Sequence, residues 1–193
     1  MIAQQDKLLD HLLNKEEQKQ TNHNNMLEKR IELSEEISNA IKEIGLTHNS
    51  HRVFILEFHN SYQNLSGTPF AKYSCTYEWF EKGSEPIQFK CKDLPFSSLS
   101  HVVNDIFKNK KQQVIYDDMK KFEEYCPSLM LLFKELETTC IVYTAMYDKN
   151  NTLVGLLVLE YQDDRYKSVN YDQLHIQAAE LTSILNLRYK YLK

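Results

Sequence analysis

The spacing of apolar residues changes several times along the chain, and each change predicts a new element. The first 44 residues lack Pro and Gly and are dense in Glu, Lys, Gln and Leu, which predicts one long helix ending at Gly45. Runs of β-branched and aromatic residues predict strands at 51–58, 72–80, 113–116, 139–147 and 153–159. Helical patterns are predicted at 95–107, 127–136 and after Asn170, and a polar loop at 59–69.

The last third of the chain has the clearest pattern. Residues 153–159 are apolar on both sides, which predicts a central strand covered above and below. Gly155 within this run indicates close packing of another element. Asn170 is a good N-cap residue for the last helix, and Asp172 suits its first turn.

This order of elements indicates an α+β fold, with an antiparallel sheet and helices on both faces. A chain of 193 residues accommodates one domain with a helical extension. We therefore expect an N-terminal helix over 1–45, as a candidate coiled coil, and a second unit over 46–193.

Apolar residues in the N-terminal helix recur at spacings of four and three, which is typical of a coiled-coil seam. The seam residues are Met26, Leu33, Ile37, Ala40 and Ile44. One interpretation is that the helix packs on its own sheet. The other is a parallel homodimer, which the length favours, because more than 40 residues span about 60 Å and exceed what this domain can cover.

Composition narrows the classes of partner and compartment. The net charge is -4, so we expect no nucleic acid partner, and the short run 108–111 is interpreted as a solvated loop. The chain has no apolar run of the roughly 18 residues that a membrane span needs, and its start does not resemble a signal peptide. The four scattered cysteines favour reduced thiols in a cytoplasmic protein.

Two motifs in the last third resemble the GAF domain, a sensory relative of the PAS fold. Residues 144–160 are similar to its closing hairpin, with Gly155 in the usual place, and residues 165–174 are similar to the start of its last helix. The resemblance covers Leu46 to Lys193. It implies a small-molecule pocket between the sheet and the mid-chain helices, and dimerisation through the first and last helices.

The first half more narrowly resembles short GAF-like proteins of phages and mobile elements. The resemblance lies in the turn at 58–61, where Ser61 replaces a glycine, and in the strand segment 72–78. The cyclic-nucleotide motif of GAF domains is absent at 122–126, and no Cys-His pair suggests bilin attachment. The resemblance therefore names no cofactor.

The second strand is the main candidate for a binding surface. Alternation predicts that Tyr73, Cys75, Tyr77 and Trp79 share one face and that their neighbours share the other. The candidate ligand-binding residues are Glu57, His59, Asn60, Lys72, Ser74, Thr76 and Glu78. The alternative is a half-exposed edge strand in which Glu57 and Lys72 form a structural ion pair.

Other constellations carry weaker signals. Arg52 and Glu160 are expected to form a surface ion pair if the first and last strands are neighbours. His48, His51 and His59 match no metal motif, so no metal site is predicted. Cys91 and Cys126 would be the redox pair of a free methionine sulfoxide reductase, a minor alternative. No nucleophile elbow or P-loop is present.

The sequence therefore predicts a non-catalytic sensory or regulatory module that dimerises through its helices and binds a small molecule. The alternative is a structural or protein-interaction module, phage-encoded, whose pocket is filled by its own side chains. A pocket filled by core residues would favour this alternative.

Overall fold

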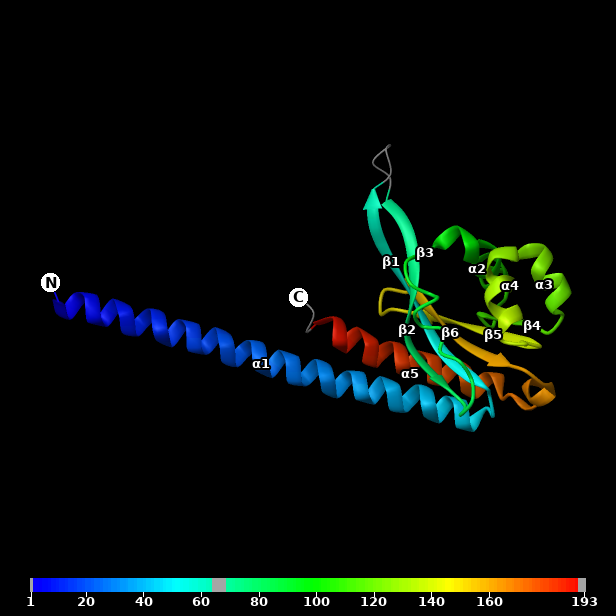
Figure 1. The fold of residues 1–193 in the computed structure, drawn as a ribbon, viewed down its shortest axis with the longest axis horizontal. Coiled ribbons are helices and arrows are strands. Elements are labelled where there is room, and N and C mark those ends of the chain that lie inside the picture. The colour runs from blue at the N-terminus through cyan, green and yellow to red at the C-terminus, as the bar shows by residue number, and fades with distance from the viewer. Residues whose placement is uncertain (1, 64–68, 191–193) are drawn as a thin grey trace.

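The fold was analysed in a computed structural model, which describes residues 2–63 and 69–190, with side chains at 15, 18–59 and 71–188. In chain order the elements are α1 (Ile2–Thr47), β1 (Arg52–Gln63), β2 (Pro69–Phe80), β3 (Leu94–Pro95), η1 (Phe96–Leu99), α2 (Ser100–Lys108), β4 (Gln113–Tyr116), α3 (Met119–Tyr125), α4 (Pro127–Glu135), β5 (Cys140–Tyr147), β6 (Leu153–Tyr161), η2 (Asp164–Ser168) and α5 (Tyr171–Lys190) (Figure 1).

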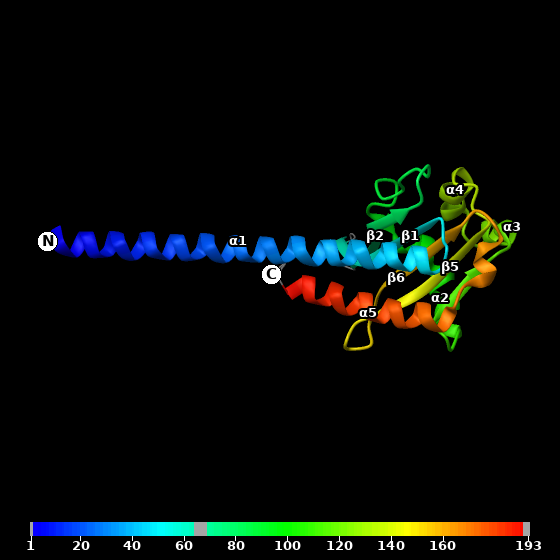
Figure 2. The same ribbon diagram turned by 90° about the horizontal axis from the view of Figure 1, so that it is seen from below.

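The strands form one antiparallel sheet in the order β3-β2-β1-β6-β5-β4. Helices α1 and α5 cover one face of this sheet, and α2, α3 and α4 cover the other (Figure 1). Figure 2 shows α5 running alongside the C-terminal part of α1, while the N-terminal part of α1 projects beyond the sheet. The predicted α+β class and the long N-terminal helix are confirmed.

The sequence predicted that the first helix ends at Gly45, but α1 continues to Thr47. The chain turns at Asn49, which has a left-handed φ of 52°. Gly45 has a packing role instead, because a Cβ there would lie 2.2 Å from a ring carbon of Trp79. A glycine inside the last turn lets the indole of β2 lie directly on the helix backbone.

The C-terminal half of α1 packs on its own chain. Leu33, Ile37 and Ile44 are buried, and Ile37 belongs to a core cluster shared with β1, β5, β6 and α5. Ala40 is half-buried against the same cluster. These four side chains of the predicted dimer seam therefore contact the domain itself, which leaves Met26, at 37% exposure, as the accessible member.

The central strand prediction for 153–159 is confirmed: β6 lies between β1 and β5, and its middle is buried. Gly155 packs closely against the neighbouring strand, since a Cβ there would lie 2.4 Å from the carbonyl oxygen of Leu56. Asn170 is confirmed as the N-cap of α5, because its Oδ1 accepts a hydrogen bond from the Gln173 N–H.

The mid-chain region differs most from the prediction. Strands β1 and β2 continue into the predicted loop, where His59 pairs with Lys72 and Gln63 with Pro69; residues 64–68 lie outside the described part. Helix α3 was not predicted, although Asp118 caps it by accepting from the Lys121 N–H. Its seven residues are too few for a periodic signal to emerge.

Candidate functional site

A groove lies between the β2–β3 edge of the sheet and helix α4, on the side covered by the mid-chain helices. It has a volume of about 500 Å³. Its wall residues include Tyr73, Leu94, Ser98, Tyr125, Leu129 and Leu132, and Lys90 and Glu135 lie at its rim. We call it the β2–α4 groove. Its size and its mixture of apolar walls and a few hydroxyl groups are typical of small-molecule pockets.

The hydroxyl groups in the groove are fixed by a short hydrogen-bond chain. The Ser98 hydroxyl donates to the Pro95 carbonyl at 2.9 Å, so its oxygen is left to accept from the Tyr73 hydroxyl, also at 2.9 Å. Burial raises the pKa of Tyr73 to about 12, so the phenol keeps its proton at neutral pH. The groove therefore presents a neutral, oriented polar edge beside its leucines.

A salt bridge spans the rim of the groove. The Lys90 ammonium donates to the Glu135 carboxylate at 2.6 Å, which joins the segment after β2 to the end of α4. The hydrogen bond that Lys90 donates to Glu135 is the main cause that raises the pKa of Lys90. Both side chains are exposed, so this bridge contributes little to stability.

The cysteines on the α2–α4 side of the sheet, Cys75, Cys91 and Cys126, have free thiols and are buried. Cys126 lines the groove, and burial raises the pKa values of both Cys91 and Cys126 to about 11. A thiol with such a pKa is almost wholly protonated at neutral pH, and the thiolate is the reactive form. This chemistry weighs against the sulfoxide reductase alternative.

A β-bulge changes the predicted faces of β2. Ile55 pairs with Tyr77 and Leu56 with Cys75, so Thr76 has no partner strand residue and the alternation reverses there. Tyr73 and Cys75 join the core under α2–α4, whereas Tyr77 and Trp79 pack against the α1–α5 side. The prediction that these four residues share one face of the sheet is therefore wrong. For the same reason, Ser74 and Glu78 lie on opposite faces of the sheet.

The structure brings together part of the predicted ligand-binding set. His59 Nε2 lies 2.9 Å from the Ser74 hydroxyl and 3.8 Å from Asp93, and Lys72 pairs with His59 across the strands. Because Ser74 and Asp93 both face the same ring nitrogen, this is not a catalytic relay, which needs the carboxylate on the other nitrogen. The side chain of Asn60 lies outside the described side chains.

The remaining predicted residues are placed elsewhere. Glu57 pairs with Ser74 rather than with Lys72, and it lines a small cavity together with Thr182 and Asn186 of α5. None of the six described candidates lines the β2–α4 groove. The groove residues come mostly from 90–135, where the GAF resemblance had indicated a pocket but no local motif stands out.

Glu78 instead belongs to a buried ion cluster. Its carboxylate pairs with Arg52 and accepts hydrogen bonds from the Ile87 and Gln88 N–H groups. Glu160 lies on the other side, with its Oε2 atom 3.4 Å from Arg52 Nε and its Oε1 atom accepting from Thr138. Strands β1 and β6 are neighbours, as the predicted pair requires. The Arg52–Glu160 pair was expected on the surface, but both side chains are wholly buried.

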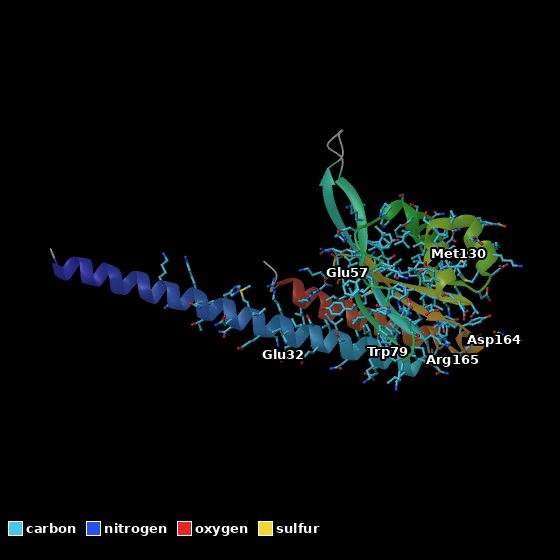
Figure 3. The ribbon with its side chains drawn as sticks, in the orientation of Figure 1. Glu32, Glu57, Trp79, Met130, Asp164 and Arg165 are labelled. Carbon is cyan, nitrogen blue, oxygen red and sulfur yellow. The ribbon has the colours of Figure 1, made fainter. Side chains whose placement is uncertain are left out.

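The three histidines are separated. His48 bonds Gln177, whereas His51 contacts Arg165 and Asp163. Arg165, labelled in Figure 3, also bonds Asn49 just after the end of α1. Among the described residues, no group of three or more His, Cys, Asp or Glu side chains is placed to hold a metal ion. The described helices include none that is long and apolar enough to span a membrane.

No protein-family model and no curated protein matches the chain. Solved structures do match it. The phycoerythrobilin-bound GAF domain of a cyanobacterial phytochrome has a TM-score of 0.61 at 13% identity, over 90% of this chain and 97% of that chain. The PixJ GAF domain of Thermosynechococcus elongatus has a TM-score of 0.59 at 14% identity, over 85% and 89%.

A GAF domain/HD domain protein from Geobacter sulfurreducens is similarly related, with a TM-score of 0.59 at 10% identity, over 86% of this chain and 97% of that chain. Identities this low show the fold alone. The chain therefore has a GAF fold, which confirms the broader resemblance seen in its sequence. The narrower resemblance to phage proteins stays a prediction.

Proposed function

We propose that this protein is a non-catalytic, GAF-type sensory or regulatory module that binds a small amphipathic molecule in the β2–α4 groove. The observation that carries the proposal is the groove itself. It combines a ligand-sized volume with leucine walls and the oriented hydroxyls of Tyr73 and Ser98. The phycoerythrobilin-bound GAF domain supports it, because a small molecule is bound there by the same fold.

The chemistry of the groove sets the class of ligand. Among the described residues that line the groove, the only cation is Lys90, and it is paired with Glu135, so this lining leaves no formal charge to bind an ionic group. Leu94, Leu129 and Leu132 favour an apolar body, and the hydroxyls of Ser97 and Ser128 are available at the edge. We infer a neutral ligand with an apolar skeleton and a few hydroxyl or carbonyl groups.

A structural or protein-interaction role is the second candidate, and one observation favours it. The space between the sheet and α2–α4 is densely filled, with Phe122, Phe133 and Tyr143 each at most 2% exposed. The groove lies beside this core rather than within it. A ligand would therefore bind at the edge, without displacing the aromatic residues.

We also propose that the protein forms a homodimer through the projecting part of α1. Leu27 and Ile31 are 46% and 53% exposed, beyond the part of the helix that packs on the sheet. Most helical stability in proteins comes from packing of an apolar face, so contact with a second copy would stabilise this part of α1. The buried residues of the predicted seam take no part in this contact.

Native mass spectrometry of the protein purified from its own host tests the ligand proposal. Ser128→Trp would fill the groove from an exposed position, and Ser183→Trp on the exposed side of α5 is a matched control. We expect a retained molecule in the wild type and in Ser183→Trp, and none in Ser128→Trp. A bare wild-type chain would favour the structural role.

A further inference from the structure

A second groove lies on the outer side of the two-helix layer, where α5 runs alongside α1. It has a volume of about 460 Å³, and its lining includes Glu32, Glu35, Glu36, Ala40, Glu43 and Ile184. We call it the α1–α5 groove. Figure 3 shows Glu32 on the side of α1 that faces away from the sheet. This groove is separate from the β2–α4 groove, which lies on the opposite face of the sheet.

The floor of the α1–α5 groove is apolar and shallow. Ala40 and Ile184 are both half-buried and pack against the core cluster under the two helices. The small side chain of Ala40 leaves room for another side chain to approach the α1 backbone. The floor therefore suits one or two apolar side chains of a partner, not a large hydrophobic face.

The walls of the groove are acidic. Glu32 is paired with Lys29 at 2.6 Å, whereas the other wall carboxylates of Glu35, Glu36 and Glu43 form no ion pair within the described part of the chain. Glu32 lies about one turn before Glu36, and Glu36 lies about two turns before Glu43, so these carboxylates follow one side of the helix and their fields add. The groove thus combines an apolar floor with a row of available negative charge.

This charge decides against a second copy of the chain as the occupant. A two-fold contact places the same surface of each copy against the other, so the glutamates would face glutamates. Like charges across an interface cost free energy and suppress that pairing. A phosphate-rich partner is also disfavoured, because its negative charges would face the glutamates of the groove.

We propose that the α1–α5 groove binds a basic amphipathic helix of another protein. Lysine or arginine residues of that helix would pair with Glu35, Glu36 and Glu43, and an apolar residue between them would contact Ala40 and Ile184. Helix-in-groove recognition of this kind uses anchors spaced at three and four residues. The charge complementarity is the argument for this partner.

The site is compatible with the homodimer proposed for the projecting part of α1. Leu27 lies nine residues before Glu36, which is about two and a half helical turns, so these two side chains are on opposite sides of the helix. Ile31 lies about one turn before Glu35 on the same face, so the dimer contact and the proposed site would adjoin at Glu35, and Glu36 and Glu43 form the part of the site that is turned away from the dimer contact. The inference does not depend on a ligand in the β2–α4 groove.

The test uses a labelled synthetic helix about five turns long, with lysine and arginine on one face and a central leucine, and its fluorescence anisotropy with the full-length protein. A peptide with glutamate in place of the basic residues is the peptide control. The variant Glu36→Lys/Glu43→Lys changes the groove, and Glu123→Lys/Glu124→Lys on α3 makes the same change in net charge elsewhere on the surface.

We expect one basic peptide to bind per chain, with affinity that falls as salt is raised. Glu36→Lys/Glu43→Lys should weaken binding at least about tenfold, and the α3 variant should weaken it much less. Absence of binding, or an equal loss in both variants, would overturn the proposal. So would a change in subunit number in Glu36→Lys/Glu43→Lys, because that would make the groove a contact between copies.

Discussion

Arg52, the first residue of β1, faces Glu160 of β6 across neighbouring strands, and both side chains are wholly buried. The guanidinium of Arg52 also pairs with Glu78 of β2, so one cation lies between two carboxylates inside the domain. This arrangement ties the central strands together where α1 passes into the sheet. Removal of the Arg52 cation or of a carboxylate would therefore change the charge balance inside the domain and so alter its stability.

Replacing Arg52 by methionine should strongly destabilise the protein, because two buried carboxylates would lose their cation. We expect the free energy of unfolding to fall by about 3–5 kcal/mol, measured by urea denaturation. Lys90→Met is the matched control, since it breaks an exposed ion pair and should lower the free energy of unfolding far less. Equal, small effects of the two changes would contradict the burial of the cluster.

Glu160 should make the stability depend on pH. Burial is the main cause that raises its pKa above the usual 4.5. A carboxyl with a raised pKa contributes stability that is present below pH 4.5 and is lost as the pH rises through the folded-state pKa. The free energy of unfolding of Glu160→Gln minus that of the wild type should therefore increase as the pH rises from acid to neutral. A constant difference between the two stability curves would contradict this prediction.

His51 should have the opposite dependence on pH. Burial, followed by the charge of Arg165, lowers its pKa below 6.5, and its Nδ1 atom accepts a hydrogen bond from the Gln162 N–H at 3.1 Å. The neutral ring therefore contributes stability above pH 6.5 that is lost as the pH falls through the lower folded-state value.

Denaturation curves of wild type and His51→Gln at a series of pH values between about 8 and 5 measure this effect. We expect the wild type to lose more stability on acidification than His51→Gln. His175→Gln, at an exposed position on α5, should follow the wild type. A wild-type curve parallel to that of His51→Gln would exclude the proposed role of His51.

Gly45→Ala tests the contact between α1 and the indole of Trp79. Alanine favours a helix by about 1 kcal/mol over glycine, yet its Cβ would overlap the ring. We expect a net loss of about 1–3 kcal/mol in the free energy of unfolding. Trp79→Leu should relieve the overlap, so the double variant should be more stable than the sum of the single effects predicts. Additive effects would mean that the residues do not interact.

The proposed dimer can be tested on the exposed side of α1. Replacing Leu27 and Ile31 together by glutamate should convert dimers to monomers, measured by analytical ultracentrifugation, because the change places charges at two exposed apolar positions of the proposed contact. Glu28→Gln, between them in the sequence, is the control. A monomeric wild type, or a dimer that survives both substitutions, would exclude this contact.

The long, periodic elements could be predicted from sequence, as could the short strand β4, whereas the two-residue strand β3 and the seven-residue helix α3 could not. The strands around Gly155 and the helix capped by Asn170 carry local patterns that agree with their tertiary positions. The bulge at Thr76 has no such pattern, and it reversed the faces inferred for β2. Burial of Arg52 and Glu160 also depends on elements far apart in the chain.

The candidate site illustrates the same limit. The fold resemblance indicated a pocket beside the mid-chain helices, but the polar residues chosen on β1 and β2 do not reach the β2–α4 groove. Tyr73 lines it because of the bulge, and Ser98 lines it because η1 places it beside β2. Neither placement is encoded within a few neighbouring residues, so only the assembled sheet and helices define the site.

The central claim is that the β2–α4 groove binds a small, neutral, amphipathic molecule. A crystal structure of the protein purified from its own host tests it most directly. We predict electron density between Tyr73 and Leu129, with polar contacts to the hydroxyls of Ser98 or Ser128. A groove that holds only water, in a crystal where its surface faces solvent, would contradict the claim.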